Sequence, residues 1–205
     1  MAVKNGTYRG QSAAERRAER RARLLAAALE VWSEDPAVTM TKICTRAGLS
    51  ERYFYEHFTC LDDALTALVD SIAFEIAAAS TTALEVSEGT ARERIHAALT
   101  AYVQLLVDDP RKGVVAMIEA YSFPATRERR SQLMQQFVLL AERESQAVVA
   151  LSERSRAETR MAATAFVGGL HQLITDWLGD DLDAEPDALV NVAVQLWQSM
   201  MAPEE

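Results

Sequence analysis

The stretch that decides the fold runs over residues 39–58 and reads TMTKICTRAGLSERYFYEHF. Thr39 can cap a short helix over 40–47, because its side-chain oxygen can accept a free backbone N–H of the first turn. Gly48 can adopt the left-handed conformation that ends a helix tightly, and Ser50 can cap the next helix at once. Two short helices joined by a three-residue turn with a glycine predict a helix-turn-helix.

The second helix of this motif, predicted over 50–57, carries two different faces. On a helical wheel of about 100° per residue, Phe54 and Phe58 fall together, and we assign that side to the core. The opposite side mixes charged and aromatic side chains: Arg52, Tyr53, Tyr55 and Glu56. Arginine can bond guanine edges through two donors and tyrosine hydroxyls can reach bases or phosphates, so this face is typical of a major-groove reader. Glu56 has two open roles: it can accept from a cytosine amino group, or hold Arg52 in an ion pair one turn away.

A longer helix is predicted ahead of the motif, over 14–33. Its apolar side chains recur at the spacing of one helical stripe, which can pack against the helix over 40–47. The stripe consists of Leu25, Ala28, Leu29 and Trp32. Three helices therefore make a predicted DNA-binding domain over residues 1–58, with a basic N-terminal extension.

Charge is distributed unevenly along the chain. The net charge of −9 at pH 7 argues, by itself, against a nucleic-acid partner. Residues 1–58, however, hold ten Lys and Arg against seven Asp and Glu, whereas residues 59–205 hold eleven against twenty-three. A basic head on an acidic body suits a protein that presents only one end to a polyanion such as DNA.

Residues 59–205 are predicted to form a helical bundle. Ala and Leu are frequent, apolar positions recur at three- and four-residue spacing, and no stretch alternates as a strand does. The predicted fold class is all-α, an N-terminal three-helix helix-turn-helix domain plus a C-terminal helical bundle, with roughly nine helices in total. The expected helices cover 14–33, 40–47, 50–57, 61–82, 89–108, 111–121, 126–153, 156–179 and 186–201.

The chain lacks the signals of a secreted or membrane protein. No window approaches eighteen consecutive apolar residues, and the N-terminal stretch has no apolar signal-peptide segment. Cys44 and Cys60 are too few for a disulfide framework or a cysteine zinc site. We therefore expect a cytoplasmic protein with reduced thiols and no membrane partner.

An enzymatic role can be tested against the motifs that carry chemistry. Glu93 and His96 form a Glu-x-x-His, as in di-iron helical bundles, but such a site needs a second copy and two further glutamates. Neither His57 nor His171 has a glutamate three residues before it, so the set cannot be completed. The chain also has no Gly-rich phosphate loop and no G-x-S-x-G nucleophile motif. We expect no enzyme, no catalytic residue, no metal and no cofactor.

Over residues 39–58 the chain resembles the TetR family of bacterial transcriptional regulators. The resemblance rests on a threonine before the second helix, an isoleucine, an Ala-Gly pair, a hydrophobic residue followed by serine, and a tyrosine shortly before His-Phe. In this chain they are Thr39, Ile43, Ala47-Gly48, Leu49-Ser50, Tyr55 and His57-Phe58. The motif covers about residues 20–68, and order and spacing both match. The rest of the chain resembles the family only in helix number and length, which suits a variable regulatory domain.

The resemblance implies roles for individual residues of the motif. Base contacts would come from Arg52 and Tyr53, with Glu51 beside them. The rest of the DNA-contacting set, which reaches phosphates and the backbone, would be Thr41, Ser50, Tyr55 and His57.

Two positions depart from the family pattern. Residues 52 and 53 are usually small in the family, so the bulk of Arg52 and Tyr53 implies a different operator or a deeper insertion into the groove. Where the family commonly has a phosphate-contacting lysine at the start of the fourth helix, this chain has Leu61. The arginine cluster over 16–23 is the available substitute for that contact.

The resemblance also implies a small-molecule pocket inside the domain over 59–205. Methionine and aromatic linings suit an apolar ligand, although core packing is the commoner explanation for any one such residue. The candidates are Tyr102, Met117, Tyr121, Phe137, Phe166 and His171.

The last two predicted helices are expected to form the surface of a homodimer. A glycine inside a helix costs about 1 kcal/mol relative to alanine, so Gly168-Gly169 suggest the close approach of another helix. Val190, Val194 and Trp197 form an apolar stripe on the final helix. The alternative is that both helices only complete the core of the monomer.

Together these features predict a homodimeric transcriptional repressor, released from a palindromic DNA operator by a small, largely apolar ligand. One alternative is a helical DNA-binding protein without an inducer. The other is a helical-bundle enzyme, which the missing motifs disfavour.

Overall fold

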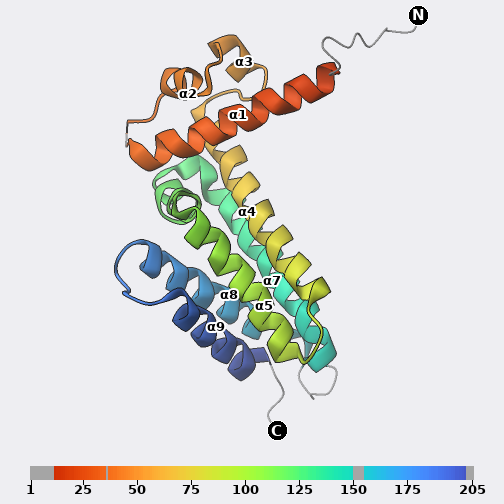
Figure 1. Cartoon of the computed structure of the whole chain (residues 1–205). Helices are drawn as coiled ribbons and strands as arrows, with labels where there is room; N and C mark the ends of the chain where they lie inside the picture. The colour runs from red at the N-terminus through yellow and green to blue at the C-terminus, as the bar shows by residue number, and fades with distance from the viewer. Residues whose placement is uncertain (1–11, 36, 150–154, 202–205) are drawn as a thin grey trace, which may run out of the picture. The chain divides into compact units, whose positions relative to one another are not determined.

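The computed structural model describes residues 12–35, 37–149 and 155–201. Within these ranges the chain is built of helices and has no strand, which confirms the all-α prediction (Figure 1). The chain divides into two compact units, which we call unit 1 (Met1–Val69) and unit 2 (Asp70–Glu205).

Unit 1 contains the three predicted N-terminal helices: α1 (Ala13–Glu34), α2 (Met40–Ala47) and α3 (Glu51–Tyr55). It also takes in the first turns of α4 (Leu61–Val86), whereas the predicted domain boundary lay between residues 58 and 59. These turns carry buried apolar side chains, namely Ala64, Leu65, Leu68 and Val69.

A capping box fixes the start of α1. The Ser12 hydroxyl accepts from the Glu15 N–H at 3.1 Å, and the Glu15 carboxylate accepts from the Ser12 N–H at 2.6 Å. Further along, the helix packs against α2 and buries one face. That face includes all four residues of the predicted stripe. It consists of Leu24, Leu25, Ala27, Ala28, Leu29, Val31 and Trp32.

The turn between α2 and α3 has the predicted geometry. The Thr39 hydroxyl accepts from the Lys42 N–H at 3.2 Å and so caps α2. Gly48 ends α2 in the left-handed region, with φ 61° and ψ 38°. The Leu49 N–H then donates to the Cys44 carbonyl at 3.0 Å, which closes the helix end in the manner of a Schellman motif.

The expected start and end of α3 need two corrections. Ser50 occupies the N-cap position, but its side chain makes no capping hydrogen bond. The α-helix ends at Tyr55 instead of residue 57, because the His57 N–H donates to the Phe54 carbonyl at 2.9 Å in a tighter turn. The tighter turn still brings Phe58 into the core, where its ring lies 5.3 Å from that of Phe54.

By length and composition, α4 is the one helix among the described residues that could cross a membrane, with a mean hydropathy of 1.4. Two carboxylates within it form ion pairs with basic side chains of unit 2, Asp70 with Arg129 and Glu75 with Lys112. The interior of a membrane would not supply such partners. This is the pattern of a core helix.

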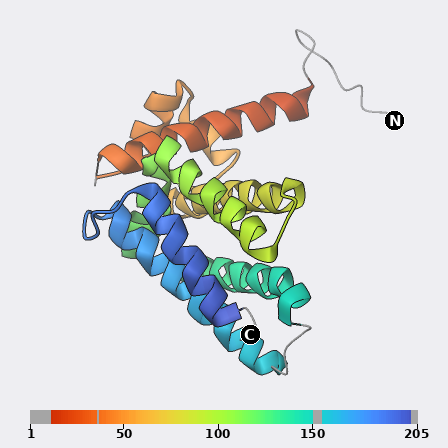
Figure 2. The same ribbon diagram turned by 60° about the horizontal axis from the view of Figure 1, so that its bottom comes forward.

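Unit 2 continues with four long helices. They are α5 (Ala91–Asp108), α7 (Arg127–Val149), α8 (Arg156–Leu178) and α9 (Pro186–Met201). α5 packs on α9, α7 packs on α8, and α8 packs on α9 (Figure 2). The last four residues of the helix predicted over 126–153 lie outside the described residues.

The single helix predicted over 111–121 is instead a chain of short pieces. α6 (Pro110–Gly113) leads into a π-helix, η1 (Val114–Ile118), followed by the 3-10 turns η2 (Glu119–Ser122) and η3 (Pro124–Thr126). One tertiary contact and one local hydrogen bond accompany the distortion. A Cβ on Gly113 would lie 2.4 Å from a methyl carbon of Leu178, and the buried Thr126 hydroxyl donates to the Ala120 carbonyl at 2.6 Å.

Candidate nucleic-acid interface and ligand cavity

The outward face of α3 and the start of α2 form the candidate nucleic-acid interface. The Arg52 side chain is 87% exposed and Tyr55 is 59% exposed. The Thr41 hydroxyl donates to Glu51 at 3.2 Å, which ties the beginnings of α2 and α3 together. Five of the seven residues predicted to contact DNA are exposed: Thr41, Ser50, Glu51, Arg52 and Tyr55.

Glu56 forms ion pairs with arginines on two helices in this DNA-free structure. Its carboxylate lies 3.6 Å from Arg52 Nε, one turn back on α3, and 3.6 Å from Arg20 Nη2 on α1. Of the two roles left open by the sequence, the structure therefore shows the ion pair. Arg52 is held at one atom only and in solvent, so the pair leaves it available to a stronger partner.

Tyr53 and His57 turn toward α1 instead of standing on the exposed face. The Tyr53 ring is half-buried, with the Arg20 guanidinium 4.7 Å from its centre. The His57 ring is also half-buried, and its Nε2 is buried without a hydrogen-bond partner among the described residues. Burial, followed by the charges of Arg17, Arg20 and Arg21, lowers the pKa of His57, so the ring is neutral at pH 7. Their predicted DNA contacts would require these side chains to move.

Arginines of α1 hold the C-terminal ends of α2 and α3 in place, a role that the sequence did not reveal. Arg23 Nη2 donates to the Ala47 carbonyl at 2.7 Å and so satisfies the C-terminal end of α2. Arg17 Nη2 donates to the Glu56 carbonyl at 3.1 Å, just after α3. The arginine cluster over 16–23 is visible in the sequence, which predicts phosphate contacts for it but not this role within the fold.

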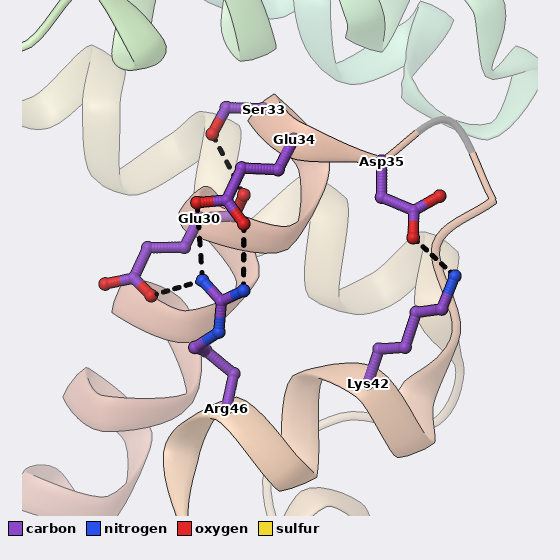
Figure 3. Close-up of polar contacts among 6 residues, drawn as sticks. All are labelled: Glu30, Ser33, Glu34, Asp35, Lys42 and Arg46. Atoms are coloured by element: carbon purple, nitrogen blue, oxygen red, sulfur yellow. Dashed lines mark hydrogen bonds and ion pairs between the residues drawn. The ribbon is translucent and has the colours of Figure 1, made fainter.

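Ion pairs also tie α2 to the end of α1. Figure 3 shows Arg46 between Glu30 and Glu34, at 2.8 Å from each, and Lys42 beside Asp35. The hydrogen bond from Lys42 holds the pKa of Asp35 below its usual value. These basic residues are therefore neutralised within unit 1, and the count of basic residues over 1–58 overstates the charge available to DNA.

The start of α4 departs from the family pattern in charge as well as in residue type. Leu61 is followed directly by Asp62 and Asp63 in the first turn. The Asp63 carboxylate accepts from the N–H and hydroxyl of Thr59, at 2.8 and 3.1 Å, and so ties the preceding turn to the first turn of the helix. A phosphate would meet carboxylates here, which disfavours a backbone contact at this helix end.

Unit 2 contains a cavity of about 140 Å³. Its wall is formed by α4, α5, η1, α7, α8 and α9. Five of the six predicted candidates line it: Tyr102, Met117, Phe137, Phe166 and His171. The sixth, Tyr121, is not part of the wall, but its hydroxyl lies 2.8 Å from His171 Nε2.

The cavity wall is almost free of charge. Glu144 is the one charged residue among the described residues that line it, and it pairs with Arg94 at 3.6 Å. Burial, with a smaller contribution from Arg130, lowers the pKa of His171 and keeps its ring neutral. Burial also raises the pKa of Tyr102, so its hydroxyl keeps the proton.

Glu93, considered above as half of a metal motif, acts as a helix cap. Its carboxylate accepts from the Thr90 N–H and hydroxyl, each at 2.8 Å, in the capping box of α5. The capping role by itself explains why a glutamate stands at position 93, three residues before His96.

Comparison with known proteins gives a clear result only at the level of structure. No family model and no curated protein sequence matches the chain. The fatty acid degradation regulator FadR from Bacillus halodurans superimposes with a TM-score of 0.76 and 19% identity, over 87% of this chain and 94% of that one.

Two further solved structures agree. FadR from Bacillus subtilis, in complex with stearoyl-CoA, has a TM-score of 0.72 and 20% identity over 86% of this chain and 96% of its own. A TetR-like transcriptional regulator from Rhodococcus sp. RHA1 has a TM-score of 0.66 and 18% identity over 88% and 94%. The chain therefore has the fold of TetR-like transcriptional regulators.

Proposed function

We propose that the chain is a DNA-binding transcriptional regulator of the TetR family, whose α3 enters the major groove of a palindromic operator. The observation that carries this proposal is the exposed Arg52 on a helix whose other face, Phe54, is fully buried. On that face the arginine is accessible to a nucleic-acid partner. The solved structures of the same fold support the proposal, because those named above are transcriptional regulators.

In this proposal the residues of α1, α2 and α3 have separate roles in DNA binding. Arg52 leaves Glu56 and bonds a guanine edge through two donors, because its guanidinium matches the paired acceptors of that base. Tyr55 and Thr41 donate to phosphates and set the register of the protein on the duplex. The arginines of α1 hold the turn between α2 and α3 and keep α3 at a fixed angle.

The cavity of unit 2 supports regulation by a small molecule. We propose that a ligand bound there releases the protein from DNA, which makes it a repressor acting in the cytoplasm. The ligand can change operator affinity only by its differential affinity for the two conformations. The alternative, a DNA-binding protein without an inducer, assigns no role to this cavity.

A gel-shift titration tests the DNA-binding proposal. DNA fragments that flank the gene of this protein are titrated with purified protein at fixed salt, against unrelated fragments of equal length. We expect one fragment to bind at least about a thousandfold tighter than the unrelated DNA. Equal affinity for all fragments would contradict a specific operator in this DNA.

We further propose that α8 and α9 form the interface of a homodimer, which would place two α3 helices about one turn of DNA apart, 34–36 Å. Val190, Val194 and Trp197, the predicted stripe, are buried within unit 2 and complete its core. The surface left for a partner includes Gly168, where an added Cβ would meet nothing within 4 Å. Two large apolar side chains on these helices are also exposed: Met161 on α8 is 63% exposed and Val192 on α9 is 50% exposed.

Substitution of Gly168 tests this interface. Gly168→Trp is expected to convert the dimer to a monomer at micromolar concentration, because the indole fills the space that a partner helix needs. The mass by light scattering should fall from twice to once 22.6 kDa. Gly168→Ala is the control, since it adds helix propensity of about 1 kcal/mol with little bulk. A dimer that survives Gly168→Trp unchanged places the interface elsewhere.

A further inference from the structure

We propose that the cavity of unit 2 takes an uncharged, largely apolar compound with one oxygen acceptor, such as a ketone, and that Tyr102 recognises this oxygen. The inference rests on the proposed function and names the class of its ligand. It is carried by a mismatch between a strong buried donor and a weak acceptor in the cavity wall.

The mismatch lies between α5 and the π-helix η1. The Tyr102 side chain is buried, and its hydroxyl donates to the Met117 sulfur at 3.8 Å. Among the described residues this hydroxyl has no other acceptor. A thioether is a weak acceptor, so the hydroxyl is left with much less than a full hydrogen bond. A carbonyl oxygen in the cavity would complete it.

The charges of the wall favour an uncharged ligand over an ionised one. Glu144 already has Arg94 as its partner, and the Arg94 Nε also donates to the Leu84 carbonyl at 3.3 Å. His171 is neutral because burial lowers its pKa. A carboxylate ligand would therefore lose its hydration without gaining a free cation in the wall.

The volume sets the size of the ligand. An enclosed cavity of about 150 Å³ holds a molecule the size of benzene, so a cavity of about 140 Å³ holds about one aromatic ring. A short chain on that ring would extend out of the cavity, which is not closed on all sides.

Binding of such an oxygen would act on the least regular segment of unit 2. Met117 lies in η1, and π-helical turns are frequently found at functional sites. The chain enters η1 through Gly113, which packs against Leu178 without room for a side chain. A ligand oxygen that replaces the Met117 sulfur as acceptor breaks the hydrogen bond between Tyr102 and Met117. One contact between α5 and η1 is then lost.

Three probes of similar size test the inference: butyrophenone, n-pentylbenzene and 4-phenylbutyrate. Binding to the full-length protein is measured by calorimetry and by the rise in the midpoint of thermal unfolding. Butyrophenone is expected to bind about tenfold more tightly than n-pentylbenzene, because one hydrogen bond contributes about that factor. 4-Phenylbutyrate is expected to bind at least about tenfold more weakly than butyrophenone.

Tyr102→Phe is the matched variant, since it removes only the hydroxyl. It should bind n-pentylbenzene as the original protein does, which also shows that it folds, and should lose the preference for the ketone. A retained preference, an equal affinity for 4-phenylbutyrate, or no binding of any probe would each overturn the inference. Operator binding of the original protein is measured separately, so failure of the DNA-binding proposal is recognised independently of these results.

Discussion

Replacing Phe54 with alanine is expected to lower the free energy of unfolding of unit 1 by about 3–5 kcal/mol, the usual cost of removing a buried aromatic ring. Phe54 is 0% exposed, and its ring lies against that of Phe58. α3 is only five residues long, so it cannot hold its shape alone and depends on this side chain for its position. Loss of the ring should therefore abolish specific DNA binding, in addition to lowering the stability of unit 1.

Tyr55→Ala is the matched control for this prediction. It removes a ring of almost the same size from the adjacent residue of the same helix, but that ring is 59% exposed. We expect a change in stability within about 0.5 kcal/mol, as for other surface positions. Hydrogen exchange of the backbone amides in α1, α2 and α3 measures the stability of unit 1 separately from unit 2. Equal losses in both variants would mean that Phe54 is not the anchor of α3.

Arg52→Ala is expected to weaken operator binding by about 1–3 kcal/mol and to relax discrimination at one base position. The side chain is 87% exposed, and the carboxylate of its partner Glu56 lies 3.6 Å away in solvent. Such an ion pair contributes little to folding, so the thermal stability should hardly change. The loss should appear only in the complex with DNA.

A set of operators with single base-pair changes provides the measurement. The original protein should lose affinity at one position where Arg52→Ala loses none, because the contact is already missing. Arg52→Lys separates charge from geometry, since lysine keeps the charge but cannot offer two donors in a plane. It should restore overall affinity in part and discrimination hardly at all. If Arg52→Ala binds the whole operator set as the original protein does, α3 reads the bases through other residues.

Local sequence signals determined the fold class and the motif. The three- and four-residue periodicity predicted the helices, and the spacing of Thr39, Gly48 and Phe54 predicted the helix-turn-helix that the structure contains. Such signals act within one or two helical turns. A capping side chain, a left-handed glycine and an apolar stripe each work through backbone neighbours, so they can be recognised without a partner from elsewhere in the chain.

Only the tertiary structure decided how the side chains of the motif are engaged. The wheel placed Tyr53 on the outer face, but the Arg20 guanidinium of α1 draws its ring inward. Glu56 pairs with Arg52 and also with Arg20, and Arg20 lies far from Glu56 in the sequence. A helical wheel gives the direction of a side chain and says nothing of what stands opposite it.

The same distinction separates the helices of unit 2 from its cavity. The sequence predicted most of the helices but gave one continuous helix over 111–121, where the structure has a π-helix and 3-10 turns. Gly113, just before the π-helix, lies against the distant residue Leu178, a contact that periodicity cannot reveal. The sequence also proposed Tyr102 and Met117 as ligand candidates without showing that they face each other across the wall. Periodicity determined which segments are helical; packing between segments decided the shape of the cavity, because that shape depends on residues brought together from six elements.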